Sequence, residues 1–265
     1  MDYKDKIALC YDNLAAKYDL AIGPKTKSNI GKLFRDIDGL IHPTVLDIGC
    51  GTGNATFELM QKLEGRGHFL GIDISKEMVA IARIKAEELG FINVAFEVMD
   101  AENLNFPKPQ FDFVFSNQVF HWIKNRQALL KGVYNCLKPG GKLAFVFQGE
   151  NSFNELFWAY QETKRRFPNM NLLDQPPSLT VEETEGLLRD AGFRRINVFG
   201  VKRTHHINPL LFLTSENLSM TPWTVGLAPQ DIAILQKQVV SELVKIKPKD
   251  TLKTTIETVF CYATS

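Results

Sequence analysis

Three alternating glycines, Gly49, Gly51 and Gly53, stand between an apolar run and a helical pattern that begins near Asn54. Glycine has no Cβ atom, so a turn of this kind bends sharply and lets the backbone approach a ligand closely. The helix that follows points unsatisfied N–H groups at the same place, where they favour polar or anionic groups. The spacing therefore predicts a loop that holds a nucleotide-like cofactor.

The spacing of these glycines differs from the dinucleotide fingerprint. That fingerprint, G-x-G-x-x-G, needs its third glycine at the position where this chain has Asn54. A nicotinamide-dependent dehydrogenase is therefore the disfavoured interpretation of this turn.

Carboxylates end the next two apolar runs. Asp73 closes the run that begins at Phe69, and Asp100, with Ala101 beside it, closes the run that begins at Val94. In an open parallel sheet, ligands bind beyond the carboxyl ends of the strands. We expect both carboxylates to lie there, with Asp73 placed to accept hydrogen bonds from the two hydroxyls of a ribose.

The order of these parts is more specific than any one of them. Residues 43–149 resemble a class I S-adenosylmethionine-dependent methyltransferase that acts on small molecules. The resemblance is carried by the glycine motif that Asp47 opens, by Asp73 and Asp100, and by the late turn Leu137–Leu143. It implies a Rossmann-like α/β fold: a seven-stranded, mostly parallel sheet of order 3-2-1-4-5-7-6, flanked by helices and carrying a helical cap.

The resemblance also implies S-adenosyl-L-methionine as the cofactor. The backbone of the glycine turn would contact its methionine moiety, Asp73 its ribose diol, and Asp100 the amino edge of its adenine. The segment Tyr11–Asp19 fits a Y-D-x-x-A-x-x-Y-D-like pattern that closes over the cofactor in many such enzymes. The cofactor-binding residues implied are Asp47, Gly49, Cys50, Gly51, Gly53, Asp73, Ile74, Asp100, Ala101, Asn117, Tyr11 and Tyr18.

An aromatic pair follows the fourth predicted strand, at the edge that the resemblance turns toward the transferable methyl group. The trans-aconitate and juvenile hormone acid methyltransferases carry a similar pair, which implies a carboxylate substrate. Trp122 could donate its indole N–H to a carboxylate oxygen, and His121 could act as a general base. Both are expected catalytic residues, and both could instead be packing residues of the sheet edge.

The acceptor atom is left open by the sequence. A carboxylate needs little acid–base help, whereas an alcohol, a phenol or a carbon acid needs a base, and the chain offers no clear one besides His121. Carboxyl O-methylation by in-line displacement is therefore favoured. The alternatives are a C- or phenol O-methyltransferase of the quinone-biosynthesis type and a non-catalytic protein that binds S-adenosylmethionine.

Composition limits the partners of the chain. It has 265 residues, 45% of them hydrophobic, with 31 Lys and Arg against 30 Asp and Glu. Such a balance favours a small-molecule substrate over nucleic acid or a membrane surface. The four cysteines are scattered and show no metal-ligand spacing, so we expect no metal and a reduced, cytoplasmic protein. A monomer and a homodimer remain equally open.

Apolar spacing divides the chain into three parts. Residues 1–40 are expected to form an N-terminal helical lid, with a first helix over about twenty residues and a second over 26–37. The S-adenosylmethionine-binding core comprises residues 41–149, 179–206 and 249–265. Within it, Thr180 and Glu183 have the spacing of a capping box. Residues 150–178 and 207–248 are expected to form the helical cap over the substrate site.

Overall fold

The structure is a computed structural model that describes residues 1–21, 29–35, 37, 39–170, 172–208, 221–246 and 252–265. The helices are α1 (Tyr3–Ala21), α3 (Asn54–Lys62), α4 (Lys76–Glu88), α5 (Arg126–Cys136), α6 (Asn154–Arg166), α7 (Val181–Ala191), α9 (Thr221–Thr224) and α10 (Pro229–Ile246), with short 3₁₀ turns η1 (Ala101–Asn103) and η2 (Phe120–Trp122). The strands are β1 (Thr44–Ile48), β2 (His68–Asp73), β3 (Val94–Val98), β4 (Phe111–Asn117), β5 (Leu137–Gln148), β6 (Arg194–Ile207) and β7 (Leu252–Thr264).

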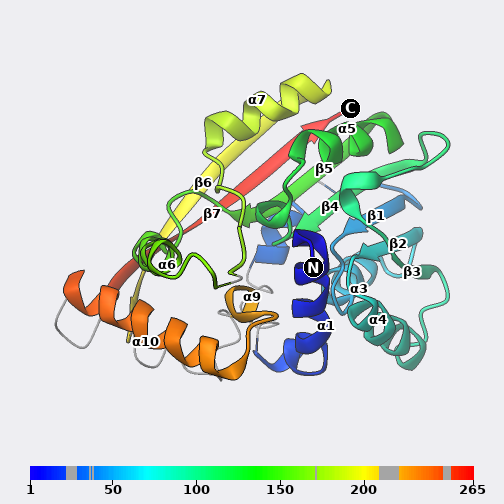
Figure 1. Cartoon of the computed structure of the whole chain (residues 1–265). Coiled ribbons are helices and arrows are strands. Elements are labelled where there is room, and N and C mark those ends of the chain that lie inside the picture. Colours follow the sequence, from blue (N-terminus) through cyan, green and yellow to red (C-terminus); the bar gives the residue numbers. More distant parts are fainter. Residues whose placement is uncertain (22–28, 36, 38, 171, 209–220, 247–251) are drawn as a thin grey trace.

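The strands form one seven-stranded sheet in the order β3-β2-β1-β4-β5-β7-β6 (Figure 1). Strand β1 pairs in parallel with β2 and β4, and the parallel set continues to β3 and β5. Strand β7 runs antiparallel to both of its neighbours, β5 and β6. The fold class, the strand order and the mostly parallel pairing predicted from the resemblance are confirmed.

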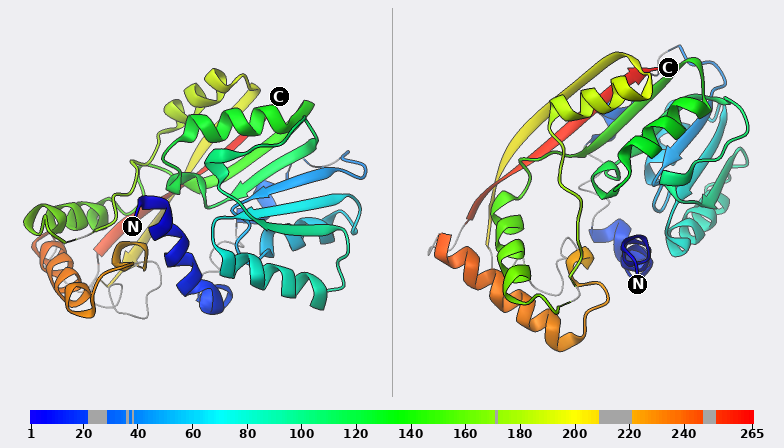
Figure 2. Two further views of the ribbon diagram at one scale, coloured as in Figure 1. Left: turned by 45° about the vertical axis from the view of Figure 1, so that its right-hand side comes forward. Right: turned by 45° about the horizontal axis from the view of Figure 1, so that its top comes forward.

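Helices cover both faces of the sheet, which explains why its central strands are mostly apolar. Every residue of β1 from Val45 to Ile48 is at most 2% exposed. One face packs against α3, α4 and a helical segment at 29–33, and the other packs against α5 and α7. Figure 2 shows these helices on opposite sides of the sheet.

Capping residues in the sequence mark both ends of helix α7. The Thr180 side chain accepts from the Glu183 N–H, and the Glu183 side chain accepts from the Thr180 N–H, which forms the predicted capping box of α7. Gly192 ends that helix in the left-handed region, with φ of 102°. The predicted helix over 26–37 is described only in part, because residues 22–28, 36 and 38 lie outside the described residues.

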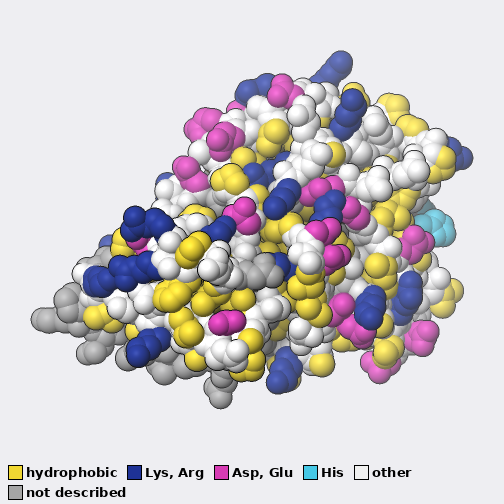
Figure 3. Space-filling model, viewed as in Figure 1, with side chains coloured by type: hydrophobic (Ala, Val, Ile, Leu, Met, Phe, Trp, Pro, Cys, Tyr) yellow, Lys and Arg dark blue, Asp and Glu magenta, His cyan; other side chains and the backbone are white. Residues whose placement is uncertain are grey.

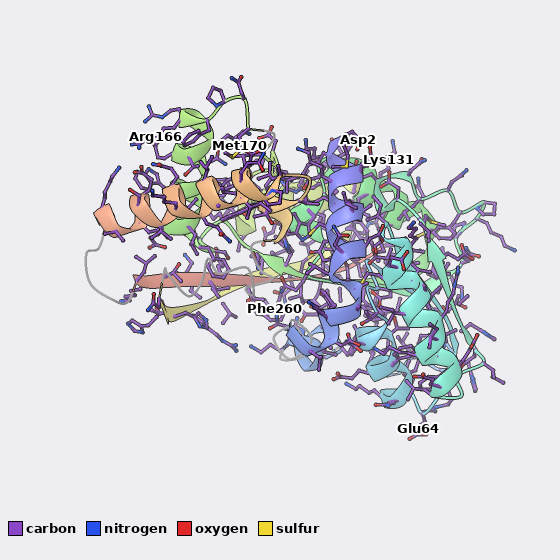
Figure 4. The ribbon with its side chains drawn as sticks, turned by 60° about the horizontal axis from the view of Figure 1, so that its bottom comes forward. Asp2, Glu64, Lys131, Arg166, Met170 and Phe260 are labelled. Atoms are coloured by element: carbon purple, nitrogen blue, oxygen red, sulfur yellow. The ribbon has the colours of Figure 1, made fainter. Side chains whose placement is uncertain are left out.

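A second helical body lies against the start of β7, away from the parallel strands of the sheet (Figures 1 and 2). Helices α6 and α10 pack through their own hydrophobic cluster, in which the rings of Tyr160 and Trp223 stack with centroids 4.4 Å apart. Figure 4 shows α1 between this body, which carries Arg166 and Met170, and the helices that cover the sheet. Of the cap segment expected at 207–248, residues 209–220 and 247–248 lie outside the described residues.

Candidate active site

The glycine turn lies at the carboxyl end of β1. Gly49, Gly51 and Gly53 all have positive φ, of 69°, 53° and 83°, where a side chain would strain the backbone. A Cβ atom on Gly49 would lie 2.1 Å from Cγ2 of Val119, so this glycine permits close packing. A Cβ atom on Gly51 would meet only the Tyr18 ring, at 4.0 Å. Gly51 therefore leaves open space beside the turn.

Asp73 ends β2 next to this turn and holds it through backbone hydrogen bonds. Its carboxylate accepts from the N–H of Gly51 and from the N–H of Ser75, each at 2.9 Å. Burial raises the pKa of Asp73, and the hydrogen bonds from Ser75, Gly51 and Ile74 oppose that rise. The structure thus brings Asp73 and Ile74 to the glycine turn, as the sequence predicted.

Asp100 follows β3 and lies, like Asp73, at the carboxyl ends of the parallel strands. Its Oδ1 accepts from the N–H of Glu102, and its Oδ2 accepts from Nζ of Lys4 at 2.6 Å. Lys4 also forms an ion pair with Glu102, at 2.9 Å. Lys4 comes from α1, so the N-terminal helix contacts the carboxylate expected to bind adenine.

These parts surround one cavity with about 780 Å³ of space free of protein atoms, including its open mouth. The cavity is lined by Tyr3, Lys4, Ile7, Tyr11, Tyr18, Gly49, Gly51, Ile72, Asp73, Ile74, Met78, Met99, Asp100, Ala101, Glu102, Asn117, Gln118, Val119, Trp122 and Ile123. On the molecular face in Figure 3, acidic and basic side chains mix around the start of α1.

Three predicted cofactor residues are not among those that line the cavity. Asp47 is 2% exposed and accepts from Oγ1 of Thr56 at 2.6 Å, and burial raises its pKa to about 7. Burial also raises the pKa of the Cys50 thiol, and a Cβ atom on Gly53 would collide with the Phe57 ring. These three residues therefore support the turn from the protein interior and do not face the cavity.

Aromatic side chains form part of the cavity wall, beginning beside the glycine turn. The Tyr11 ring meets the rings of Tyr18 and Trp122 edge to face, with centroids 6.3 and 6.5 Å apart. The Trp122 indole also acts as a hydrogen-bond partner that opposes the burial-driven rise in the pKa of Tyr11. The hydroxyl of Tyr3 donates to the carbonyl oxygen of Trp122 at 2.9 Å. The structure therefore brings Tyr11, Tyr18 and Trp122 together along the cavity wall.

The His121 side chain is buried in the protein and does not face the cavity. It is 4% exposed, it does not line the cavity, and its Nδ1 lies 3.5 Å from the N–H of Gln148. Burial, and to a smaller extent the charge of Arg126, lowers the pKa of His121 to about 3. A neutral imidazole of such low basicity, held outside the cavity, is poorly placed for the general-base role expected from the sequence.

Helix α1 is fastened over the cavity at three places. Besides the contacts of Lys4, Asp12 accepts from Oγ of Ser75 at 2.6 Å. Asp19 accepts from Oγ1 of Thr52 at 2.5 Å and from Nδ2 of Asn54 at 2.8 Å. Each of these partners adjoins the glycine turn or the start of α4, so the helix bridges the elements that form the site.

The sequence had not singled out Tyr3, Lys4 and Glu102 as site residues. Tyr3 belongs to the apolar stripe recognised along the first twenty residues, so its spacing could have suggested it. Lys4 and Glu102 are single charges on polar segments, and nothing local distinguishes them from solvated residues.

No group of three His, Cys, Asp or Glu side chains suited to a metal ion occurs in the described part of the chain. The four cysteines are buried and free. No helix within the described ranges is long and apolar enough to cross a bilayer.

Comparison with known proteins places the chain in a protein family. The model of a methyltransferase domain matches residues 42–185. Aklanonic acid methyltransferase DauC of Streptomyces is 33% identical over 145 residues, 54% of this chain and 66% of that protein. Demethylmenaquinone methyltransferase of Listeria welshimeri is 26% identical over 76% of this chain and 92% of its own length. Malonyl-[acyl-carrier protein] O-methyltransferase of Bacillus cereus is 33% identical over 45% of this chain, which covers 43% of that relative.

Solved structures share the fold. The YcgJ protein of Bacillus subtilis superimposes with a TM-score of 0.66 over 90% of this chain and 98% of its own, at 18% identity. A phosphoethanolamine N-methyltransferase of Haemonchus contortus, in complex with S-adenosylhomocysteine, gives a TM-score of 0.66 over 100% of this chain and 60% of its own, at 21% identity.

Proposed function

Because the chain belongs to the class I S-adenosylmethionine-dependent methyltransferases, we propose that it transfers a methyl group to the carboxylate of a small organic acid. The product would be a methyl ester, and S-adenosylhomocysteine would be the by-product. The family membership gives the cofactor and the reaction class. The chemical class of the methyl acceptor is our own proposal, which we base on the chemistry of the cavity.

Apart from the family membership, one feature of the cavity suits S-adenosylmethionine. Oδ1 of Asn117 is buried, lines the cavity and has no hydrogen-bond partner among the described residues. An acceptor of this kind fits a donor such as the ammonium group of the methionine moiety. Open space beside Gly51 fits the same moiety, and Asp73 and Asp100 suit the ribose and the adenine. When bound there, the cofactor supplies a methyl group already activated on a sulfonium.

The observation that carries the choice of acceptor is the lack of a usable base among the described residues that line the cavity. Burial raises the pKa of Tyr3 and Tyr11, and it raises that of Tyr18 to about 12. Asp73 is held by backbone N–H groups, and Asp100 and Glu102 are both paired with Lys4. A carboxylate acceptor is already ionised at neutral pH and needs no such base.

The aromatic end of the cavity would hold the acceptor. On binding, the indole N–H of Trp122 would exchange its partner, the Tyr11 hydroxyl, for one carboxylate oxygen. The Tyr11 hydroxyl can donate to the same oxygen, which leaves the other free to attack in line. With the cofactor bound, its sulfonium would act as the leaving group: the carboxylate oxygen would gain the methyl group, and the electron pair of the broken S–CH₃ bond would stay on sulfur. Helix α1 covers the site through Lys4, Asp12 and Asp19, which excludes water from the reacting groups.

Two relatives support an acid as substrate, because their names specify aklanonic acid and a malonyl group. A second candidate is a carbon or phenol acceptor of the quinone type. It is favoured by the demethylmenaquinone methyltransferase, the relative among these three that the chain covers most completely.

Incubation with S-adenosylmethionine carrying a labelled methyl group would separate the two candidates. The purified chain would be offered a panel of aliphatic and aromatic carboxylic acids together with a panel of phenols and quinols. Mild alkali releases the label as methanol from an ester and leaves a methyl ether or C-methyl product intact. Label that alkali does not release would contradict the proposal in favour of the second candidate.

A further inference from the structure

Gln118 directly follows β4 and has a strained backbone conformation on the wall of the cavity. Its φ is 65°, in the left-handed region, where the Cβ atom of any residue other than glycine crowds the next carbonyl oxygen. The Gln118 N–H donates to the carbonyl oxygen of Val146 on β5 at 2.6 Å, which holds this conformation in place. Strain of this kind persists only where the surrounding structure maintains it, and it is concentrated at ligand sites.

The side chain of Gln118 is half-buried, and its carboxamide makes no hydrogen bond within the described part of the chain. Other side-chain donors on the cavity wall are engaged. The Trp122 indole is hydrogen-bonded to the Tyr11 hydroxyl, and Nζ of Lys4 is paired with two carboxylates. Gln118 can therefore donate to a ligand without giving up a partner.

The neighbours of Gln118 place it at the end of the cavity where the methyl group is expected. Asn117, before it, has the buried Oδ1 that suits the ammonium group of the cofactor. Val119, after it, packs against the glycine turn, where it would collide with a Cβ atom on Gly49. The N–H of Trp122 donates to the carbonyl oxygen of Val119 at 2.8 Å, so the ring expected to hold the acceptor follows within one turn. Gln118 thus lies between the expected positions of cofactor and acceptor.

We propose that the Gln118 carboxamide orients the attacking oxygen of the acceptor carboxylate. This inference rests on the proposed function and adds the residue that aligns the reacting atoms. Nε2 of Gln118 donates to one lone pair of that oxygen, and the other lone pair faces the methyl group. A neutral amide binds a carboxylate less strongly than a cation does, so the oxygen stays nucleophilic. The same hydrogen bond replaces part of the hydration that the carboxylate loses on burial.

The first test removes the donor. Gln118→Leu keeps most of the side-chain volume and lacks the carboxamide. With the best acid of the panel, we expect kcat to fall by roughly 10- to 100-fold and KM to rise by less than about threefold, because alignment matters most in the transition state. Calorimetry should give an affinity for S-adenosylhomocysteine close to that of the wild type.

The second test changes the charge and keeps the shape. Gln118→Glu places a carboxylate against an anionic acceptor, so methyl transfer at about pH 8 should fall by roughly 100-fold or more. Burial and the acceptor's charge raise the pKa of the introduced carboxyl, which becomes an O–H donor as the pH falls. Activity relative to the wild type should therefore recover toward about pH 5.5. A purely structural role of Gln118 would give no such recovery.

A pair of glycine variants separates the carboxamide from the strained backbone. Gln118→Gly removes both. Glu64→Gly relieves similar strain, φ of 54°, at an exposed residue that Figure 4 shows well away from Asp2 and the start of α1. Both variants should keep the Tm of the wild type or raise it by up to roughly 4 °C. Only Gln118→Gly should lose methyl transfer, to the level of Gln118→Leu.

The outcomes distinguish this inference from the proposed function. A wild type that forms no ester from any acid of the panel would overturn both. Esters formed equally fast by Gln118→Leu and the wild type would overturn only the role of Gln118. So would a loss in Gln118→Glu that does not recover, relative to the wild type, as the pH falls.

Discussion

Trp122 and His121 are adjacent in the sequence and differ in what surrounds them. The short turn η2 directs Trp122 to the cavity and His121 into the protein, where it is 4% exposed. The sequence could identify the aromatic pair, because its types and its place after β4 are local features. It could not say which ring reaches the ligand, because that depends on the direction of one 3₁₀ turn.

Replacing Trp122 with Phe should lower kcat/KM for the acid substrate by roughly 10- to 100-fold, because the variant lacks an N–H donor to a charged acceptor. Steady-state kinetics with the best acid of the panel would measure this loss. The affinity for S-adenosylhomocysteine, measured by calorimetry, should change little. Unchanged kcat/KM in a folded variant would argue against the donor role of Trp122.

His121 should affect stability rather than the rate. Its folded-state pKa, about 3, lies below the ordinary value near 6.5, so the unfolded state binds the extra proton as the pH falls between these values. From pH 7 to pH 5 the free energy of unfolding of the wild type should therefore change unfavourably by about 2 kcal/mol relative to that of His121→Asn. Urea unfolding of both proteins at the two pH values measures the difference.

The comparison with the variant is needed because a second buried group opposes the first. The folded-state pKa of Asp47, about 7, lies above its ordinary value, so its contribution to stability increases as the pH falls. The wild type alone would show the two effects nearly cancelling. A parallel pH dependence in His121→Asn would show that the imidazole is not buried in its neutral form.

At the scale of elements, helix α1 is the part whose role depends most on distant contacts. The spacing of Tyr3, Tyr11 and Tyr18 predicted a helix with one buried stripe, and the structure has that helix. Its polar fastenings through Lys4, Asp12 and Asp19 join residues far apart in the chain. Such partners have no local pattern, so the sequence could not specify them.

Asp19→Ala should loosen the end of α1 that lies over the glycine turn. The variant loses the hydrogen bonds that Asp19 accepts from Thr52 and Asn54. We expect faster amide hydrogen exchange across α1 and a several-fold weaker affinity for S-adenosylhomocysteine, by about 1 kcal/mol. The exposed Lys17, on the same helix, supplies the matched control Lys17→Ala, which should behave as the wild type. Equal exchange in the two variants would contradict the fastening role.

For the whole molecule, the sequence predicted the sheet far better than the body that stands beside it. The core follows from strong local features: glycines, acids at strand ends and mostly apolar strands. The lengths of strands β6 and β7 have no clear sequence signal, because the strands carry polar residues such as Lys202, Arg203 and Lys253. Pairing between these two strands, rather than an apolar pattern, extends them.

Binding of the cofactor product should stabilise the whole chain. At a concentration one hundred times its Kd, S-adenosylhomocysteine should add about 2.7 kcal/mol to the free energy of unfolding, which corresponds to a rise in Tm of roughly 5–10 °C. NAD at the same concentration should give no shift, because the turn lacks the third glycine of the dinucleotide fingerprint. A thermal-shift assay with both ligands measures this, and an equal shift with NAD would contradict the assignment of the cofactor.

The antiparallel strand β7 also bears on biosynthesis. Strand β5 emerges from the ribosome long before the strand that must cover its open edge, and contacts such as that between Asn151 and Glu257 join positions 106 residues apart. During that interval the nascent sheet exposes an unpaired apolar edge, which other chains can join. Productive folding of this protein should therefore depend on the speed of translation and on chaperones that shield β5 until β7 arrives.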